Sequence, residues 1–228
     1  MEIHRPKPWH GWRAFLKEYA IIVVGVLTAL AGEQAVEAVH WRHEVAETER
    51  AVRTELALDV GALRFRQNQS ACFNRRVAEL SLLYEGWRTG QPKSTARAIS
   101  QPLMYGYQTD AWQVAETGQV AAHIPLEKRI RYAQIYGQMR LLDGLQGEEA
   151  DVWRELAQFE GTAAVPDGHD LMRLRGLISN LKRAEVVRTF NLVTLEARAE
   201  PLGVKPEARV PGNVAVQKAF CASLFAAG

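Results

Sequence analysis

The chain has 228 residues, of which 24% are charged and 47% are hydrophobic, and its formal net charge at pH 7 is +2. This composition excludes a disordered chain and a protein with many membrane spans. A charge this small favours neither nucleic acid nor strongly acidic partners, and the Lys and Arg residues are scattered rather than grouped.

The N-terminal part of the chain is a basic leader followed by an uncharged run. Residues 1–14 contain Arg5, Lys7 and Arg13 and predict a cytoplasmic tail. The run 19–32 reads YAIIVVGVLTALAG, and at about 1.5 Å per residue it covers only about 21 Å of a hydrocarbon layer ~30 Å thick. Apolar residues on both sides lengthen it, so we predict a transmembrane helix over residues 15–41 and an exported domain over residues 42–228.

Two alternatives compete with this anchor. A secretory signal would be cleaved near Ala31, after the small-x-small pattern Ala29-Leu30-Ala31. The buried helix of a soluble protein would also suit so short a run. We favour the anchor because no helix breaker follows the run and because the leader before it is basic.

The charges flanking the span predict its orientation. Lys and Arg prevail before the span and Glu prevails after it, so the N-terminus is expected in the cytoplasm. In a bacterial chain the span would lie in the inner membrane and residues 42–228 in the periplasm.

Two sets of residues on the span suggest contacts within the membrane. Gly25, Ala29 and Gly32 form a small-residue face of the kind that lets membrane helices pair. Glu33 and Glu37 share one helix face just after the apolar run, where they would serve an oligomer contact or a proton relay. Because the span is short, we favour two carboxylates that lie in the outer headgroup layer.

A stalk is expected to continue the same helix to about residue 67. Its apolar residues recur at helical spacing, but the heptads are too few for a coiled coil, so the stalk should pack against the domain's own helices. Its charged residues should form the solvated faces. The apolar positions are Val45, Val52, Leu56, Val60 and Leu63, and the charged positions are Glu44, Glu47, Glu49, Arg50, Arg53 and Glu55.

Further helices follow in chain order. Ser70 is the expected N-cap of a helix that ends in the 89–94 loop, and residues 92–109 are expected to be a long connection packed on the bundle. Asp110 should cap a short helix over 111–117, a second short piece covers 119–123, and Pro125 should begin a helix to about residue 145.

The remaining helices complete an all-α fold. Gly144 and Gly147 allow a corner into a helix over 148–160, and Asp167 should cap a helix over 169–198. The last helix is expected over 213–225. No stretch alternates with period two, so we predict an irregular antiparallel helical bundle. The apolar stripe of the 169–198 helix is expected to run from Leu171, Leu174, Leu177, Ile178 and Leu181 to Val186, Phe190, Val193 and Leu195.

Cys72 and Cys221 are the chain's two cysteines. In an oxidising compartment they would form a disulfide that ties the C-terminal segment to the second helix. Two unrelated buried thiols are the alternative, and the neighbouring Arg75 and Arg76 could also lower the pKa of a free Cys72 thiol.

Three aromatic residues, Trp112, Tyr136 and Trp153, are candidates for lining a ligand pocket, although such rings more often form the core. His123, His169 and Asp170 have no neighbour at a spacing that orients a triad or a metal. The sequence lacks Gly-rich phosphate loops and the CxxC, HExxH and GxSxG motifs. We therefore predict no catalytic residue, no metal and no cofactor.

Several stretches together resemble a group of small, single-span, inner-membrane helical proteins of bacteria whose function is unknown. They are the run EYAIIVVGVLTAL at 18–30, the later AWQ at 111–113 with Thr117 and Gly118, Ile124-Pro125, and YAQIY at 132–136. The resemblance implies a membrane anchor and an all-helical body, and it supplies no activity and no site residues.

The expected function is a non-enzymatic one in the cell envelope. The partners would be the lipid bilayer and either a second copy of the chain or another envelope protein, with no nucleic acid. The alternatives are a ligand-binding, sensor-like periplasmic domain, or a secreted helical protein after cleavage near Ala31.

Overall fold

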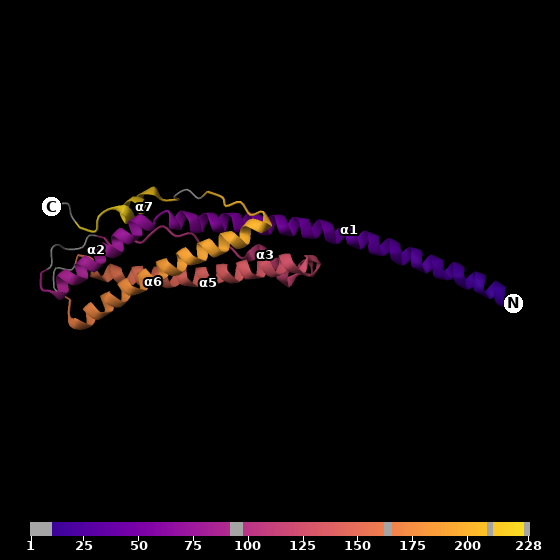
Figure 1. Cartoon of the computed structure of the whole chain (residues 1–228), viewed down its shortest axis with the longest axis horizontal. Helices are drawn as coiled ribbons and strands as arrows, with labels where there is room; N and C mark the ends of the chain where they lie inside the picture. Colours follow the sequence, from indigo (N-terminus) through magenta and orange to yellow (C-terminus); the bar gives the residue numbers. More distant parts are fainter. Residues whose placement is uncertain (1–10, 92–97, 162–165, 209–211, 226–228) are drawn as a thin grey trace, which may run out of the picture. The chain divides into compact units, whose positions relative to one another are not determined.

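The computed structural model describes residues 11–91, 98–161, 166–208 and 212–225. Over these ranges every regular element is a helix, which confirms the predicted all-α class. The chain divides into two compact units, residues 1–47 and residues 48–228. One 57-residue helix, α1 (Gly11–Gln67), contributes to both units (Figure 1).

The first unit contains the candidate membrane span. An 18-residue stretch of α1 is long and apolar enough to cross a membrane, and none of it is buried within the protein. Ile21, Ile22, Val24 and Leu27 are among its exposed apolar side chains. A cleaved signal sequence would also be apolar and exposed in this way. Residues 1–10 of the predicted tail lie outside the described ranges.

The second unit is a helical bundle built on the end of α1. Helix α6 packs against α5 and α2, α7 packs against α2, and α3 packs against α5 (Figure 1). Short 3-10 turns η1 and η2 follow α5 and α6. The elements are α2 (Ser70–Arg88), α3 (Asp110–Thr117), α4 (Val120–His123), α5 (Leu126–Leu156), η1 (Ala157–Phe159), α6 (Gly168–Ala199), η2 (Glu200–Leu202) and α7 (Val214–Cys221).

The end of α1 packs through the predicted apolar face, because Val52, Leu56, Val60 and Leu63 are almost completely buried. Two charged residues assigned to the solvated faces are buried as well. Glu49 accepts hydrogen bonds from Lys128, 2.8 Å from its Nζ, and Glu55 accepts one from the Tyr136 hydroxyl at 2.7 Å. A buried carboxylate needs such donors, and these come from α5, far away in the sequence.

The main core cluster joins α2, α5, α6 and the C-terminal segment. It includes Phe73 and Leu80 of α2, Trp153 of α5, and Phe220 and Leu224 near the end of the chain. Residues close to the end of the described part of the chain are therefore part of the core.

Several helix ends differ from those predicted. The corner expected at Gly144 and Gly147 is absent, since α5 runs unbroken through both. Each glycine inside a helix costs about 1 kcal/mol relative to alanine, which packing of α5 along α6 offsets. Ser70 and Asp110 are the first residues of their helices rather than the caps.

The remaining ends show one confirmed cap and one shorter helix. The Asp167 carboxylate accepts a hydrogen bond from the Asp170 backbone N–H at 2.8 Å, as an N-cap should. The last helix ends at Cys221 rather than at residue 225, and Asn213 is its cap.

Gly61 marks the place where an extended segment after η2 crosses α1. The Glu207 N–H donates to the Ala57 carbonyl at 2.8 Å. A Cβ atom added at Gly61 would lie 1.8 Å from the Glu207 carbonyl oxygen. Only a residue without a side chain allows this approach.

Candidate functional site

The C-terminal strap, which we define as residues 219–225, is fastened to α2 by a disulfide. Cys72 and Cys221 are bonded with an S–S distance of 2.08 Å across a sequence separation of 149 residues. The predicted bridge is therefore present, and the alternatives of two buried thiols or a reactive Cys72 thiol do not hold. Arg75 adds a hydrogen bond from its Nη1 to the Cys221 carbonyl at 3.0 Å.

Two further side chains of α2 bind the backbone of the same strap. Arg76 is 1% exposed, and its Nη2 donates to the carbonyl oxygens of residues 219, 220 and 222 at 3.0 to 3.3 Å. Burial lowers the pKa of this guanidinium, and the nearby Glu79 carboxylate opposes that shift. Glu79 also accepts hydrogen bonds from the Ser223 hydroxyl at 2.9 Å and from the Leu224 N–H at 3.0 Å.

A buried ion cluster lies between α1, α5 and α6 and consists of Arg66, Glu149, Glu185 and Arg188. Glu149 accepts hydrogen bonds from Arg66 Nη2 at 2.8 Å, from the Trp153 indole N–H at 3.1 Å, and from Arg188. Glu185 pairs with Arg188 and lies 3.9 Å from Arg66. The guanidiniums of Arg66 and Arg188 also lie 4.8 and 5.7 Å from the centre of the Phe73 ring.

The charges of the ion cluster balance, with two guanidiniums against two carboxylates. Desolvation lowers the pKa of Arg66, and Arg188 lowers it further, while Glu149 and Glu185 oppose the shift. Burial also raises the pKa of the nearby Tyr107 hydroxyl. Charges this deep are tolerated because they are paired, so the cluster specifies how three helices meet.

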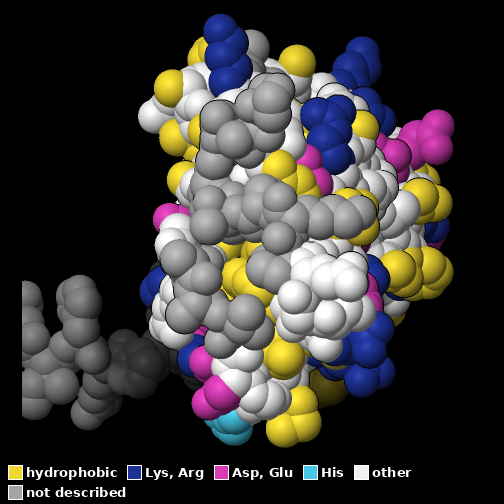
Figure 2. Space-filling model, turned by 90° about the vertical axis from the view of Figure 1, so that its left-hand side faces the viewer, with side chains coloured by type: hydrophobic (Ala, Val, Ile, Leu, Met, Phe, Trp, Pro, Cys, Tyr) yellow, Lys and Arg dark blue, Asp and Glu magenta, His cyan; other side chains and the backbone are white. Residues whose placement is uncertain are grey.

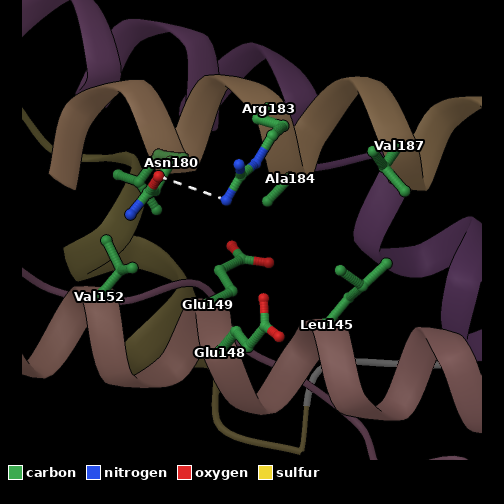
Figure 3. A pocket seen from close by; sticks show the side chains of 9 residues that line it. Leu145, Glu148, Glu149, Val152, Asn180, Arg183, Ala184 and Val187 are labelled. Atoms are coloured by element: carbon green, nitrogen blue, oxygen red, sulfur yellow. Dashed lines mark hydrogen bonds between the residues drawn. The ribbon is translucent and has the colours of Figure 1, made fainter. Parts of the chain in front are cut away.

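A pocket of about 210 Å³, the α5/α6 pocket, opens directly beside the ion cluster. Figure 3 shows that its side chains come from two facing helices, with Glu148 and Glu149 on one side and Asn180 and Arg183 on the other. Arg183 donates a hydrogen bond to Asn180 Oδ1 at 3.4 Å. The lining residues are Leu145, Glu148, Glu149, Val152, Asn180, Leu181, Arg183, Ala184 and Val187.

The aromatic residues proposed for a ligand pocket are divided between two places in the core. Trp112 stacks on Tyr136 with ring centres 6.0 Å apart, whereas Trp153 packs edge-on against Phe73 and Phe220. All three side chains are at most 1% exposed. Burial and the Glu55 carboxylate raise the pKa of the Tyr136 hydroxyl. These rings fill the interior, and the α5/α6 pocket is lined by other residues.

The residues proposed for contacts in the membrane lie on the first half of α1. Gly25, Ala29, Gly32, Glu33 and Glu37 are all exposed, and a Cβ added at either glycine would meet no atom within 4 Å. The small-residue face is therefore open along the candidate span. The predicted contact between copies stays a prediction. Glu37 accepts a hydrogen bond from the indole N–H of the neighbouring Trp41 at 3.2 Å.

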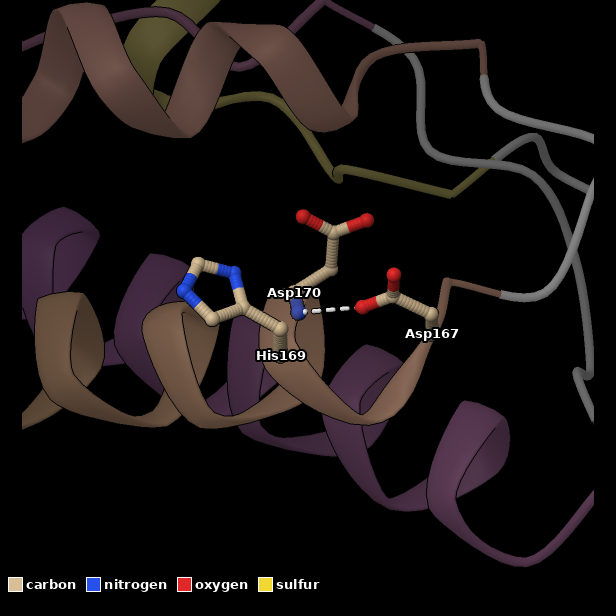
Figure 4. A group of neighbouring side chains, drawn as sticks. All are labelled: Asp167, His169 and Asp170. Carbon is tan, nitrogen blue, oxygen red and sulfur yellow. Dashed lines mark hydrogen bonds between the residues drawn. The ribbon is translucent and has the colours of Figure 1, made fainter.

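The first turn of α6 gathers Asp167, His169 and Asp170, whose ligand-type atoms all lie within 4.8 Å of one another (Figure 4). Asp167 is engaged as the helix cap, and both it and His169 are exposed. His169 thus lies at a helix end, in the first turn of α6. His123 likewise lies at the end of its helix, α4.

The apolar α6 face, which we define as Val186, Phe190, Val193 and Ala197, corrects the predicted stripe of this helix. Val186, Phe190 and Val193 are 69%, 70% and 65% exposed, whereas Leu181 and Leu195 of the predicted stripe are buried, together with Leu192. The only charged residues between 184 and 196 are Glu185 and Arg188, and both belong to the ion cluster.

The end of the second unit seen in Figure 2 has a mixed surface. Lys and Arg side chains stand apart from one another, among acidic and apolar ones, on this face. The pattern agrees with the scattered basic residues of the sequence.

No protein family, no curated protein and no solved structure matches this chain. The resemblance drawn from short stretches of the sequence therefore stays a prediction.

Proposed function

We propose that this protein is a single-span protein of the bacterial inner membrane whose periplasmic helical domain binds a second copy of the same chain. The proposed activity is binding rather than catalysis. The observation that carries it is the apolar α6 face, three large apolar side chains that stand in solvent on one side of a helix.

The spacing of this face suits another helix. Positions 186, 190, 193 and 197 are separated by four, three and four residues, which is the repeat of a helix–helix seam. Exposed apolar residues gathered on one face mark interaction sites more often than scattered ones do. Phe190 at the middle of the seam is the natural anchor, because large aromatic side chains dominate interface energies.

A second copy fits this face because the face lacks free charge. When two copies pair in parallel, each residue meets its own equivalent, and like charges would then repel. Here Thr189 and Thr194 flank the seam, and the charges of Glu185 and Arg188 are neutralised within the ion cluster. Self-pairing therefore brings no like charges together at the centre of the face.

A single helix seam is small, well below the roughly 1,000 Å² expected of a stable interface. Anchoring both copies in one bilayer raises their effective concentration and offsets this weakness. The open small-residue face formed by Gly25, Ala29 and Gly32 would add a second contact between the spans. Association should thus be strong in membranes and weak without the span.

The proposed cellular location and membrane topology rest on two features. The Cys72–Cys221 disulfide suits an oxidising compartment such as the periplasm. The basic residues before the candidate span suit a cytoplasmic N-terminus. Alkylation of intact cells and of lysed cells at a cysteine introduced after residue 42 tests this topology, because a periplasmic position reacts in both samples.

Photo-crosslinking in membranes tests the self-association. A photoreactive amino acid at position 190 of the full chain should produce a dimer when two differently tagged copies are expressed together. The same amino acid at Leu82, an exposed apolar position of α2, is the matched control and should give little dimer. Equal yields from the two positions, no product, or a product that contains a different protein would each contradict the proposal.

A substitution adds a second test. Phe190→Asp places two carboxylates against each other in the dimer, so the dimer fraction should fall about tenfold or more in membranes. Leu82→Asp should leave it unchanged. Unfolding by urea should show both variants folded, since both positions are exposed.

A further inference from the structure

The α5/α6 pocket carries one free group of each charge on opposite sides. Glu148 stands on α5 and Arg183 on α6, and Figure 3 shows both side chains directed toward the space between the helices. Within the described residues neither forms an ion pair, and the one hydrogen bond of Arg183 goes to the neutral Asn180. Both groups are exposed at the rim.

Below these two exposed groups the pocket is lined by apolar side chains and by one carboxylate that is already paired. Leu145, Val152, Leu181 and Val187 line it. Glu149 also belongs to the lining, but its carboxylate is already bound to Arg66, Arg188 and Trp153. A ligand would therefore meet one available carboxylate, one available guanidinium, one amide and an aliphatic floor.

We propose that the α5/α6 pocket binds a small zwitterion, an α-amino acid with an aliphatic side chain. The ammonium group would bind Glu148, and the carboxylate would bind Arg183, whose planar guanidinium matches a carboxylate. The Asn180 amide would donate to the same carboxylate. The aliphatic side chain would then lie on Leu145, Val152 and Val187.

The size of the pocket sets the size of the ligand. A cavity of 150 Å³ accepts benzene, with its six non-hydrogen atoms, so 210 Å³ accepts about eight. This is the size of valine, whereas tryptophan and short peptides are too large to enter completely. Charged side chains would find no partner on the aliphatic floor. We therefore expect valine and leucine to bind more tightly than glutamate, lysine or tryptophan.

Titration calorimetry on the full chain in lipid nanodiscs tests the proposal with L-valine as the probe. Saturable binding to one site per chain is expected. N-acetylvaline lacks the ammonium and valinamide lacks the carboxylate, so each should bind about ten- to a hundredfold more weakly. No heat of binding, or equal binding of the two blocked compounds and valine, would overturn the assignment.

Substitutions in the chain test which residue binds the ammonium group of valine and which binds its carboxylate. Glu148→Gln should weaken the binding of valine but not that of N-acetylvaline, which has no ammonium group for Glu148 to bind. Arg183→Gln should weaken the binding of valine but not that of valinamide, which has no carboxylate for Arg183 to bind. Asp143→Asn and Arg140→Gln alter exposed charges of α5 outside the pocket and are the matched controls. If the controls lower the affinity as much as the pocket variants do, general surface charge explains the binding and the proposal fails. The outcome is independent of self-association, because none of these residues belongs to the apolar α6 face.

Discussion

Replacing Cys72 and Cys221 together by serine should lower the stability of the second unit substantially. The bridge spans a sequence separation of 149 residues, and closing a loop of that length removes about 17 cal/mol/K of entropy from the unfolded chain. At 25 °C this amounts to about 5 kcal/mol, and measured values commonly fall somewhat below it. We expect a loss of about 3–5 kcal/mol. Because Arg76 and Glu79 still hold the C-terminal strap, the variant should fold with the strap in place.

Urea unfolding of the full chain in detergent, followed by tryptophan fluorescence, measures this loss. The indole of Trp153 packs against Phe220 in the strap, so it reports on the region that the bridge closes. Wild-type protein reduced with a thiol should match the double variant. A loss below about 1 kcal/mol would refute the reasoning from loop entropy. A changed denaturant slope would instead show that the strap had left the native state.

Three other changes follow from the buried groups. Glu149→Gln removes one of the two carboxylates that balance Arg66 and Arg188, so the free energy of unfolding in the same urea titration should fall by about 3–5 kcal/mol. A loss below about 1 kcal/mol would show that water already screens the cluster. Gly61→Ala forces its Cβ against the Glu207 carbonyl and should cost about 1–3 kcal/mol, while Gly25→Ala, which meets no atom, should leave the second unit unchanged. Tyr136 has a raised pKa in the folded state, so its contribution is complete below the unfolded pKa of about 10 and is lost as the pH rises above it. Tyr136→Phe should flatten the alkaline fall in stability by about 1.4 kcal/mol per pH unit, and equal slopes in the two proteins would contradict this.

The features that the sequence predicted well depend on local rules. Unbroken helical periodicity predicted α1 through Gln67, and a capping aspartate predicted the start of α6. The disulfide could be predicted because the chain has two cysteines and an expected oxidising address. Each of these inferences needed no knowledge of which helices touch.

The features that were wrong or missed depend on contacts between distant segments. Glu49 and Glu55 were assigned to solvent, since nothing nearby in the sequence reveals that Lys128 and Tyr136 meet them. The ion cluster draws its four members from three helices, and each looks like an ordinary surface charge in its own helix.

Two local rules also failed for the same kind of reason. Glycines at 144 and 147 predicted a corner, but α5 packs along α6 and stays helical. Phe190 was placed on the buried stripe because both faces of this part of α6 carry apolar residues, and periodicity alone could not decide which face turns inward.

The position of Phe220 and Leu224 in the core has a consequence for synthesis of the protein. A nascent chain that emerges from its N-terminus releases Phe73 and Trp153 long before these two partners exist. Until the strap has been synthesised, the side of α2 that packs against it stays exposed, and Cys72 remains a free thiol. Any holding factor or thiol oxidase that serves this protein would therefore act during that interval, before Phe220 and Leu224 have been synthesised.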